Sequence, residues 1–211
     1  GEFRLKNSNY SDWSKEDLVK EIEKLKKRKK YGIVWDEEKT KEKFDIDSEN
    51  KLPILKEVKN KEIQTDDNTP DNILIEGDNY HSLSVLNYTH INKIDTIFID
   101  PPYNTGSDTF RFNDDIVEKD DPYRHSKWLS FMGKRLILAK KLLKKTGIIF
   151  ITIDDNEYAE LKLLCDQTFA ENNLIGVICW KSRDSISNDL LISQNHNYIL
   201  IYSKNFREVF K

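Results

Sequence analysis

The sequence predicts an α/β fold in which helices cover both faces of a parallel-type sheet, preceded by a charged helical arm. Two short apolar runs, Ile94–Ile99 and Ile148–Ile153, are typical of strands buried on both faces. Stretches with helical periodicity alternate with the predicted strands, as they do in α/β proteins. Residues 1–70 differ from the rest because they are rich in charged residues and contain a single helical pattern.

The arm, residues 1–70, begins with Gly1-Glu2-Phe3, which is typical of a vector remnant. Its helix is expected to start at Ser14–Asp17, a pattern like a capping box, and to end near Gly32. The basic run Lys24–Lys30 fits either a contact with the DNA backbone or a solvated helix end. We favour the helix end, because basic and acidic residues balance in the arm. Leu52–Leu55 is expected to form a short apolar anchor.

Residues 71–211 are predicted to form the globular part of the chain. Apolar periodicity and turn residues give its expected elements. We expect strands at 73–76, 94–99, 148–153, 174–180 and 197–202, helices at 79–87, 125–145 and 156–169, and a long polar loop at 107–124.

Composition excludes several classes of protein. No apolar run approaches the length of a membrane span, and no signal peptide is present, so a cytoplasmic protein is expected. The net charge of −3 argues neither for nor against a nucleic-acid partner. Cys165 and Cys179 are expected to be reduced and buried. The four histidines show no ligand spacing, so no metal site is predicted.

The most informative stretch is Asp100-Pro101-Pro102-Tyr103, which follows the strand predicted at Ile94–Ile99. Two prolines end the strand because neither has an N–H for the ladder. They leave a carboxylate, rigid carbonyl groups and an aromatic ring at the carboxyl end of the strand, where α/β sheets bind ligands. A site rich in acceptors suits an exocyclic amino group, and the ring offers a face for a base.

These residues resemble the catalytic motif of amino-group DNA methyltransferases. The run from Gly77-Asp78 through Asn104-Thr105-Gly106 is similar to the modification subunits of type III restriction systems. The resemblance implies a Rossmann-like fold, S-adenosylmethionine as methyl donor and a flipped adenine in double-stranded DNA as substrate. Asp100 in the first position favours adenine N6 over cytosine N4. A restriction subunit or a second copy of the chain is an expected partner.

The resemblance also implies roles for single residues. Asp100, Pro101, Pro102 and Tyr103 would be catalytic, and Asp78 and Asp100 would contact the cofactor. Asp78 also suits a helix N-cap, so both readings stay open.

Other polar groups near the predicted strand ends have simpler interpretations. Asp154-Asp155 is expected to cap a helix. In the long loop, Phe110, Arg111 and Phe112 suit base stacking and phosphate contact. Lys181-Ser182-Arg183 would lie on the DNA-facing side.

One feature of the family is missing. The 7 glycines include no Gly-x-Gly, although the family needs a glycine-rich loop for the cofactor. The sequence therefore looks like the catalytic part of a permuted methyltransferase, without the glycine loop and the target-recognition region. Such a piece is expected to associate through unpaired edges. A non-catalytic DNA-binding or regulatory remnant and a cytosine-N4 methyltransferase are the alternatives.

Overall fold

The computed structural model describes residues 13–27, 32–37, 39–42, 52–63, 72–106, 110–182 and 194–209. The chain divides into two units, one ending at Gly32 and the other starting at Ile33. This division lies well before the boundary expected at residue 70. The first unit contains α1 (Lys15–Lys27), where Ser14 Oγ accepts a hydrogen bond from the Asp17 amide at 3.2 Å. The expected N-terminal cap of this helix is thus confirmed.

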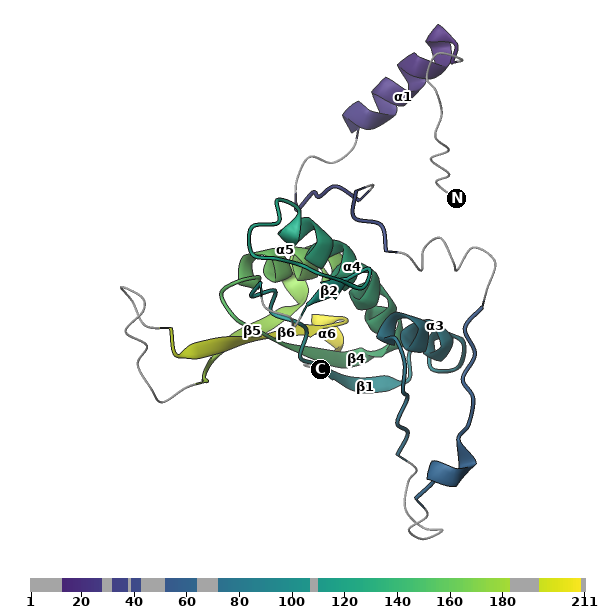
Figure 1. Cartoon of the computed structure of the whole chain (residues 1–211), viewed down its shortest axis with the longest axis vertical. Coiled ribbons are helices and arrows are strands. Elements are labelled where there is room, and N and C mark those ends of the chain that lie inside the picture. The colour runs from purple at the N-terminus through teal and green to yellow at the C-terminus, as the bar shows by residue number, and fades with distance from the viewer. Residues whose placement is uncertain are drawn as a thin grey trace. The chain divides into compact units, whose positions relative to one another are not determined.

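The second unit has an α/β architecture, and its main sheet has the strand order β1-β4-β6-β5 (Figure 1). Its strands are β1 (Ile94–Ile99), β4 (Leu143–Ile153), β5 (Leu174–Lys181) and β6 (His196–Ser203). Its α-helices are α3 (Asn79–Thr89), α4 (Arg124–Leu142), α5 (Tyr158–Phe169) and α6 (Phe206–Val209). Two 3-10 turns, η2 (Lys59–Lys61) and η3 (Glu171–Asn173), and a small hairpin, β2 (Arg111–Phe112) with β3 (Asp115–Ile116), complete it. No described helix has the length and apolar character needed to cross a membrane.

The sheet is mixed, which corrects the expected parallel arrangement. Strand β1 pairs with β4 in parallel, whereas β6 is antiparallel to both β4 and β5. The positions of these four strands were predicted correctly, but an apolar run reports that a strand is buried and carries no information on its direction.

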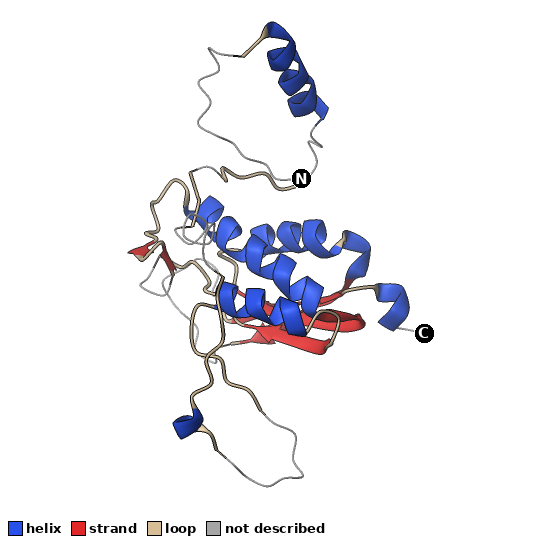
Figure 2. Cartoon of the chain, turned by 90° about the vertical axis from the view of Figure 1, so that its right-hand side faces the viewer, coloured by secondary structure: helices blue, strands red, loops and turns tan. Residues whose placement is uncertain are grey.

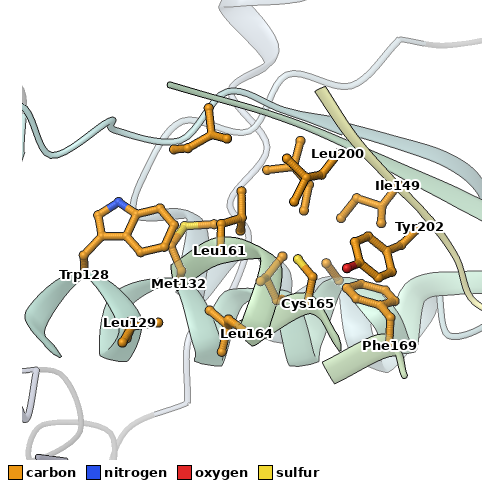
Figure 3. Close-up of a cluster of buried hydrophobic side chains, with 14 of the residues drawn as sticks. Trp128, Leu129, Met132, Ile149, Leu161, Leu164, Cys165, Phe169, Leu200 and Tyr202 are labelled. Atoms are coloured by element: carbon orange, nitrogen blue, oxygen red, sulfur yellow. The ribbon is translucent and has the colours of Figure 1, made fainter. Parts of the chain in front are cut away.

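The core lies between one face of the sheet and the helices α4 and α5, which lie on one side of the strands (Figure 2). Figure 3 shows apolar side chains of the two helices meeting those of β4 and β6. The fully buried members include Trp128, Leu161, Phe169, Ile149 and Tyr202. Burying side chains of this size contributes on the order of 2 kcal/mol each, so this layer holds the strand ends in place.

The expectation of helices on both faces is not met by the described residues. Alternation along the strands places Phe98, Ile178 and Trp180 on the face opposite the core. Phe98 is 63% exposed and the other two are 50% exposed. The apolar pattern of these strands indicates burial on both sides, but the described helices α4 and α5 cover only one.

Two further predictions were wrong for a related reason. Residues 72–76 form no strand, and Ile73 and Leu74 are 74% and 95% exposed. The anchor expected at Leu52–Leu55 is exposed as well. An apolar run such as 72–76 becomes a strand only when a neighbouring strand takes its hydrogen bonds, and this run has no strand partner among the described residues.

Residues 33–42, expected to be part of a polar linker, contact α4 instead. The Trp35 indole donates to Ser130 Oγ at 2.9 Å, and Thr40 Oγ1 lies 2.6 Å from the same hydroxyl oxygen. Glu42, with 5% exposure, pairs with Arg135 at 3.0 Å. Polar side chains therefore attach this segment to α4, a mode of packing that apolar periodicity does not reveal.

Candidate active site at the carboxyl edge of the sheet

Asp100 lies where the sequence predicted, immediately after β1 at the carboxyl edge of the sheet. The parallel register pairs Ile99 with Ile151, which brings the next residues of the two strands side by side. Thr152, with 5% exposure, donates its hydroxyl hydrogen to Asp100 Oδ1 at 2.5 Å. Because β4 fixes this donor, the orientation of the Asp100 carboxylate is set by the sheet itself.

The loop after Asp100 is attached to the helices at alternate residues. The Trp128 indole on α4 donates to the Pro102 carbonyl oxygen at 2.7 Å, and the Asn104 amide nitrogen donates to Glu157 Oε1. Pro101, between Asp100 and the Pro102 attachment, is buried. Held by β4, α4 and α5 in turn, the loop has little freedom to move relative to the sheet.

The residues after Tyr103 need special backbone conformations. Asn104 has φ +56° and Gly106 has φ +82°, both in the left-handed region. A Cβ at Gly106 would also lie 2.6 Å from Cβ of Lys119. The backbone thus explains the sequence Asn104-Thr105-Gly106, because asparagine and glycine allow the left-handed conformations that the chain adopts after Tyr103.

Tyr103 is half-buried, and its ring packs against the hydrophobic core. Burial raises the pKa of its phenol, and a hydrogen bond to Asp100 raises that pKa further, whereas bonds with Thr152 and Asn197 lower it. These effects on the pKa indicate that the phenol faces the side chains of Asp100, Thr152 and Asn197 at the carboxyl edge of the sheet.

Asp78 caps α3, as one of its two readings expected. Its Oδ1 accepts from the amides of Tyr80 at 2.8 Å and His81 at 3.4 Å. Its Oδ2 lies 3.4 Å from Arg135 Nη2, and the side chain remains 45% exposed. Asp78 therefore has a structural role, and its exposed surface leaves room for a ligand as well.

A buried polar cluster lies behind the motif loop and was missed by the sequence analysis. Glu157 is fully buried, with Oε1 bonded to Asn104 and 2.8 Å from His125 Nδ1. Burial raises the pKa of Glu157 to about 7, although Asn104 and His125 oppose the shift. Asn104 and Glu157 are 53 residues apart in the sequence, and no local pattern links them.

Ligand atoms of His125, Glu157 and Glu160 lie within 4.8 Å of one another, so the fold gathers groups that metals use, where no metal site was predicted. Glu157 Oε1 is already bonded to Asn104 within this group. We therefore interpret the group as an internal hydrogen-bond network.

Several predicted surface residues have other roles. Phe110 and Phe112 are 2% and 5% exposed and belong to the core, so the base-stacking role expected for them was wrong. The polar residues around them give no apolar period, so the sequence did not identify these two positions as buried.

The two cysteines differ in exposure. Cys165 is buried as expected, whereas Cys179 is exposed and lies on β5, the edge strand.

The acidic pair after β4 does not cap the next helix, as was expected, because the N-cap of α5 is Glu157 and it forms no side-chain capping bond. Asp154 Oδ1 accepts from the Asn156 amide at 2.9 Å, and Asp155 accepts from the Tyr198 hydroxyl at 2.9 Å. Lys181 ends β5, while Arg183 and the side chains of Lys24–Lys30 lie outside the described residues.

The sequence matches the N6_N4_Mtase family model, described as DNA methylase, over residues 94–210. This match covers more than half of the 211 residues and includes the whole carboxyl-edge site. The chain belongs to this DNA methylase family. The predicted resemblance to amino-group DNA methyltransferases is thereby confirmed.

Individual relatives agree with this assignment. The StyLTI Mod subunit, a type III restriction-modification enzyme of Salmonella typhimurium, is 43% identical over 155 residues, covering 63% of this chain and 24% of that protein. The EcoP15I Mod subunit of Escherichia coli is 36% identical over 175 residues, with 72% and 27% covered. The type II methyltransferase M.KpnI of Klebsiella pneumoniae is 43% identical over 141 residues, with 65% and 33% covered. The chain spans a quarter to a third of the length of these relatives.

Proposed function

We propose that this chain forms the catalytic part of a methyltransferase that transfers a methyl group from S-adenosylmethionine to N6 of adenine in DNA. The observation that carries the proposal is the fixed carboxyl edge of the sheet. There Thr152 orients Asp100, and Trp128 holds the Pro102 carbonyl group. Family membership and the similarity to type III modification subunits support the same reaction.

Asp100 and the Pro101 carbonyl group would accept the two hydrogens of the target amino group. The Trp128 bond to Pro102 matters here, because it occupies one carbonyl of the loop and fixes the angle of its neighbour. Two acceptors draw the nitrogen lone pair out of conjugation with the ring, which makes the nitrogen a better nucleophile. Positioning supplies most of the acceleration in such a transfer.

Tyr103 would supply the flat face on which the flipped base stacks, which is worth roughly 1–3 kcal/mol per base. Its phenol faces Asp100, the carboxylate that would accept from the target amino group, so the ring and this acceptor lie at the same edge of the sheet. Stacking on the ring would partly offset the cost of taking the base out of the duplex.

S-adenosylmethionine supplies an electrophilic methyl group bound to a sulfonium centre. Asp78 and Asp100 fit parts of such a ligand, because carboxylates suit a positive centre and hydroxyl donors, and the Asp78 side chain keeps 45% of its surface exposed. Calorimetric titration of the chain with S-adenosylmethionine tests this role. Saturable binding that weakens in Asp78→Ala supports it, and binding that is unchanged in this variant contradicts it.

Double-stranded DNA is the proposed substrate, and a restriction subunit or a second copy of the chain is the proposed protein partner. The names of the type III relatives motivate the first of these partners. A cytoplasmic location follows from such a substrate.

The test of the reaction is methyl transfer to DNA from labelled S-adenosylmethionine, comparing the parent protein with Asp100→Ala. The substitution is expected to abolish transfer and to leave the protein folded, with a lowered thermal unfolding midpoint because the buried Thr152 hydroxyl loses its bond to Asp100. Asp95→Ala is the matched control, because this aspartate is on β1 and pairs with Lys144 on the surface. Digestion of the DNA to nucleosides distinguishes N6-methyladenine from N4-methylcytosine. Undiminished transfer by Asp100→Ala would refute the mechanism.

A further inference from the structure

We propose that Glu157 is a positioning residue of the active site, which holds the motif loop in its working geometry through Asn104. This inference rests on the proposed function and extends it to a residue on α5 that the catalytic motif does not contain. Its basis is the set of contacts between the motif loop and the buried start of α5.

Asn104 is the last of the three residues, after Asp100 and Pro102, at which hydrogen bonds hold the motif loop. It directly follows Tyr103, is fully buried, and has φ +56°, which non-glycine residues rarely adopt. Its amide nitrogen donates to Glu157 Oε1 and lies 3.4 Å from the Arg124 carbonyl oxygen. The conformation of this residue therefore depends on acceptors supplied by α4 and α5.

Glu157 is suited to this role because it is rigid and shielded from solvent. It precedes the first turn of α5, is 0% exposed, and faces no water that would compete for Asn104. His125 and Glu160 are the titratable groups beside it, and both are partly exposed. A single acceptor atom, Oε1, thus connects a rigid helix start to the residue after Tyr103.

The alternating attachments explain why one distant residue affects the reaction. Asp100 is held by Thr152, the Pro102 carbonyl by Trp128, and Asn104 by Glu157. Removing the last attachment frees the end of the loop that carries the Tyr103 ring. A misplacement of about 1 Å at a reacting centre costs on the order of 100-fold in rate.

The experiment compares Glu157→Gln, which keeps an acceptor oxygen, with Glu157→Leu, which removes it at similar size. Methyl transfer is measured as separate kcat and KM values. We expect the glutamine variant to retain the parent kcat and the leucine variant to lose about 100-fold in kcat, with KM for S-adenosylmethionine within about 3-fold. Glu160→Gln is the matched control, because it changes a neighbouring carboxyl group on the same helix and should leave kcat unchanged.

A second variant covers the case in which Glu157→Leu does not fold. Asn104→Gly removes the amide donor and keeps the positive φ without strain, so it should fold and lose kcat like the leucine variant. A parent-like kcat in Asn104→Gly overturns the proposal. So does an equal loss in Glu157→Gln and Glu157→Leu, which would indicate that the charge is required and the acceptor is not.

A readout independent of activity separates this inference from the proposed function. The Trp128 indole N–H donates to Pro102 within the loop, so its exchange with solvent, measured by NMR, reports whether the loop is held. Faster exchange in Glu157→Leu and Asn104→Gly, with parent-like exchange in Glu157→Gln, supports positioning even if no methyl transfer is observed. Equal exchange in all four proteins overturns it. An absence of transfer that depends on Asp100 would count against the proposed function alone.

Discussion

At the scale of single residues, the site depends on hydrogen bonds from neighbouring strands to one carboxylate. Thr152 is buried, and its hydroxyl has the Asp100 carboxylate as acceptor at 2.5 Å. Bonds to a charged acceptor contribute about 1.5–3 kcal/mol, more than bonds between neutral groups. The orientation of the proposed catalytic group is therefore a property of β4 as much as of the motif.

We predict that Thr152→Val lowers kcat by about 10- to 100-fold, because it keeps the shape of the side chain and removes the donor to Asp100. Thr152→Ser restores the hydroxyl and should recover most of the loss. Steady-state methyl transfer measures both. Thr146→Val, an exposed threonine of the same strand, controls for a general effect of valine on β4. An active Thr152→Val would show that Asp100 is oriented by other groups.

Glu157 should also make stability depend on pH. Its pKa rises to about 7 in the folded chain from the ordinary 4.5, mainly because of burial. Between these values the unfolded chain ionises while the folded chain stays protonated, so the folded state loses stability as pH rises from about 4.5 to 7. The carboxyl of Glu160 and the imidazole of His125 face the same group and modify the curve.

We predict that Glu157→Gln, which cannot ionise, gains in thermal midpoint relative to the parent as pH rises through this window and keeps the gain above it. Thermal unfolding at a series of pH values measures the difference. His125→Ala in both proteins separates the contribution of the imidazole, whose Nδ1 lies 2.8 Å from Glu157 Oε1. A difference that does not change with pH would mean that Glu157 is ionised in the folded chain.

At the scale of elements, α4 connects three parts of the second unit through Arg135. This side chain is 7% exposed, pairs with Glu42 at 3.0 Å and donates to Asn79 Oδ1 at 2.5 Å. Its guanidinium group lies 3.7 Å from the centre of the Phe131 ring. The segment at 33–42 and the start of α3, where Asp78 lies, are thus joined by one cation.

We predict that Arg135→Met destabilises the second unit by about 1.5–3 kcal/mol, because the buried Glu42 carboxylate loses the hydrogen bonds of the guanidinium group, while Lys134 remains as a cation partner at 3.5 Å. Urea unfolding measures the change. Lys144→Met is the control, since its pair with Asp95 is exposed and should matter by about 1 kcal/mol or less. Similar losses in the two variants would show that the pair with Glu42 is not the important contact.

Elements also show where sequence reasoning succeeds and fails. The strands at Ile94 and Ile148, the helix with Trp128 and the placement of Asp100 follow from local apolar patterns, which report burial. Strand direction and the Asn104–Glu157 bond do not, because both depend on partners far along the chain. Phe110 and Phe112 were misread for the same reason, since isolated aromatic residues in a polar loop give no period.

At the scale of the whole molecule, the most prominent feature is the apolar character of the sheet face opposite α4 and α5. Phe98, Ile178 and Trp180 are each at least half exposed on this face. Exposed apolar side chains on a sheet face favour association with another surface. The described helices leave this face uncovered, so we infer that it is an interaction surface.

We predict that the 211-residue chain associates in solution, with a mean mass in light scattering that rises with concentration. A double substitution, Phe98→Lys with Ile178→Lys, places two charges on the face and should shift the protein toward a monomer. Leu163→Lys is the matched control, because this residue is 47% exposed on α5, away from that face, and its change should leave the association intact. A parent chain that stays monomeric at high concentration would mean that the exposed face tolerates water. Association that survives the double substitution would instead locate the contact elsewhere, with Ile73 and Leu74 as the next apolar side chains to replace.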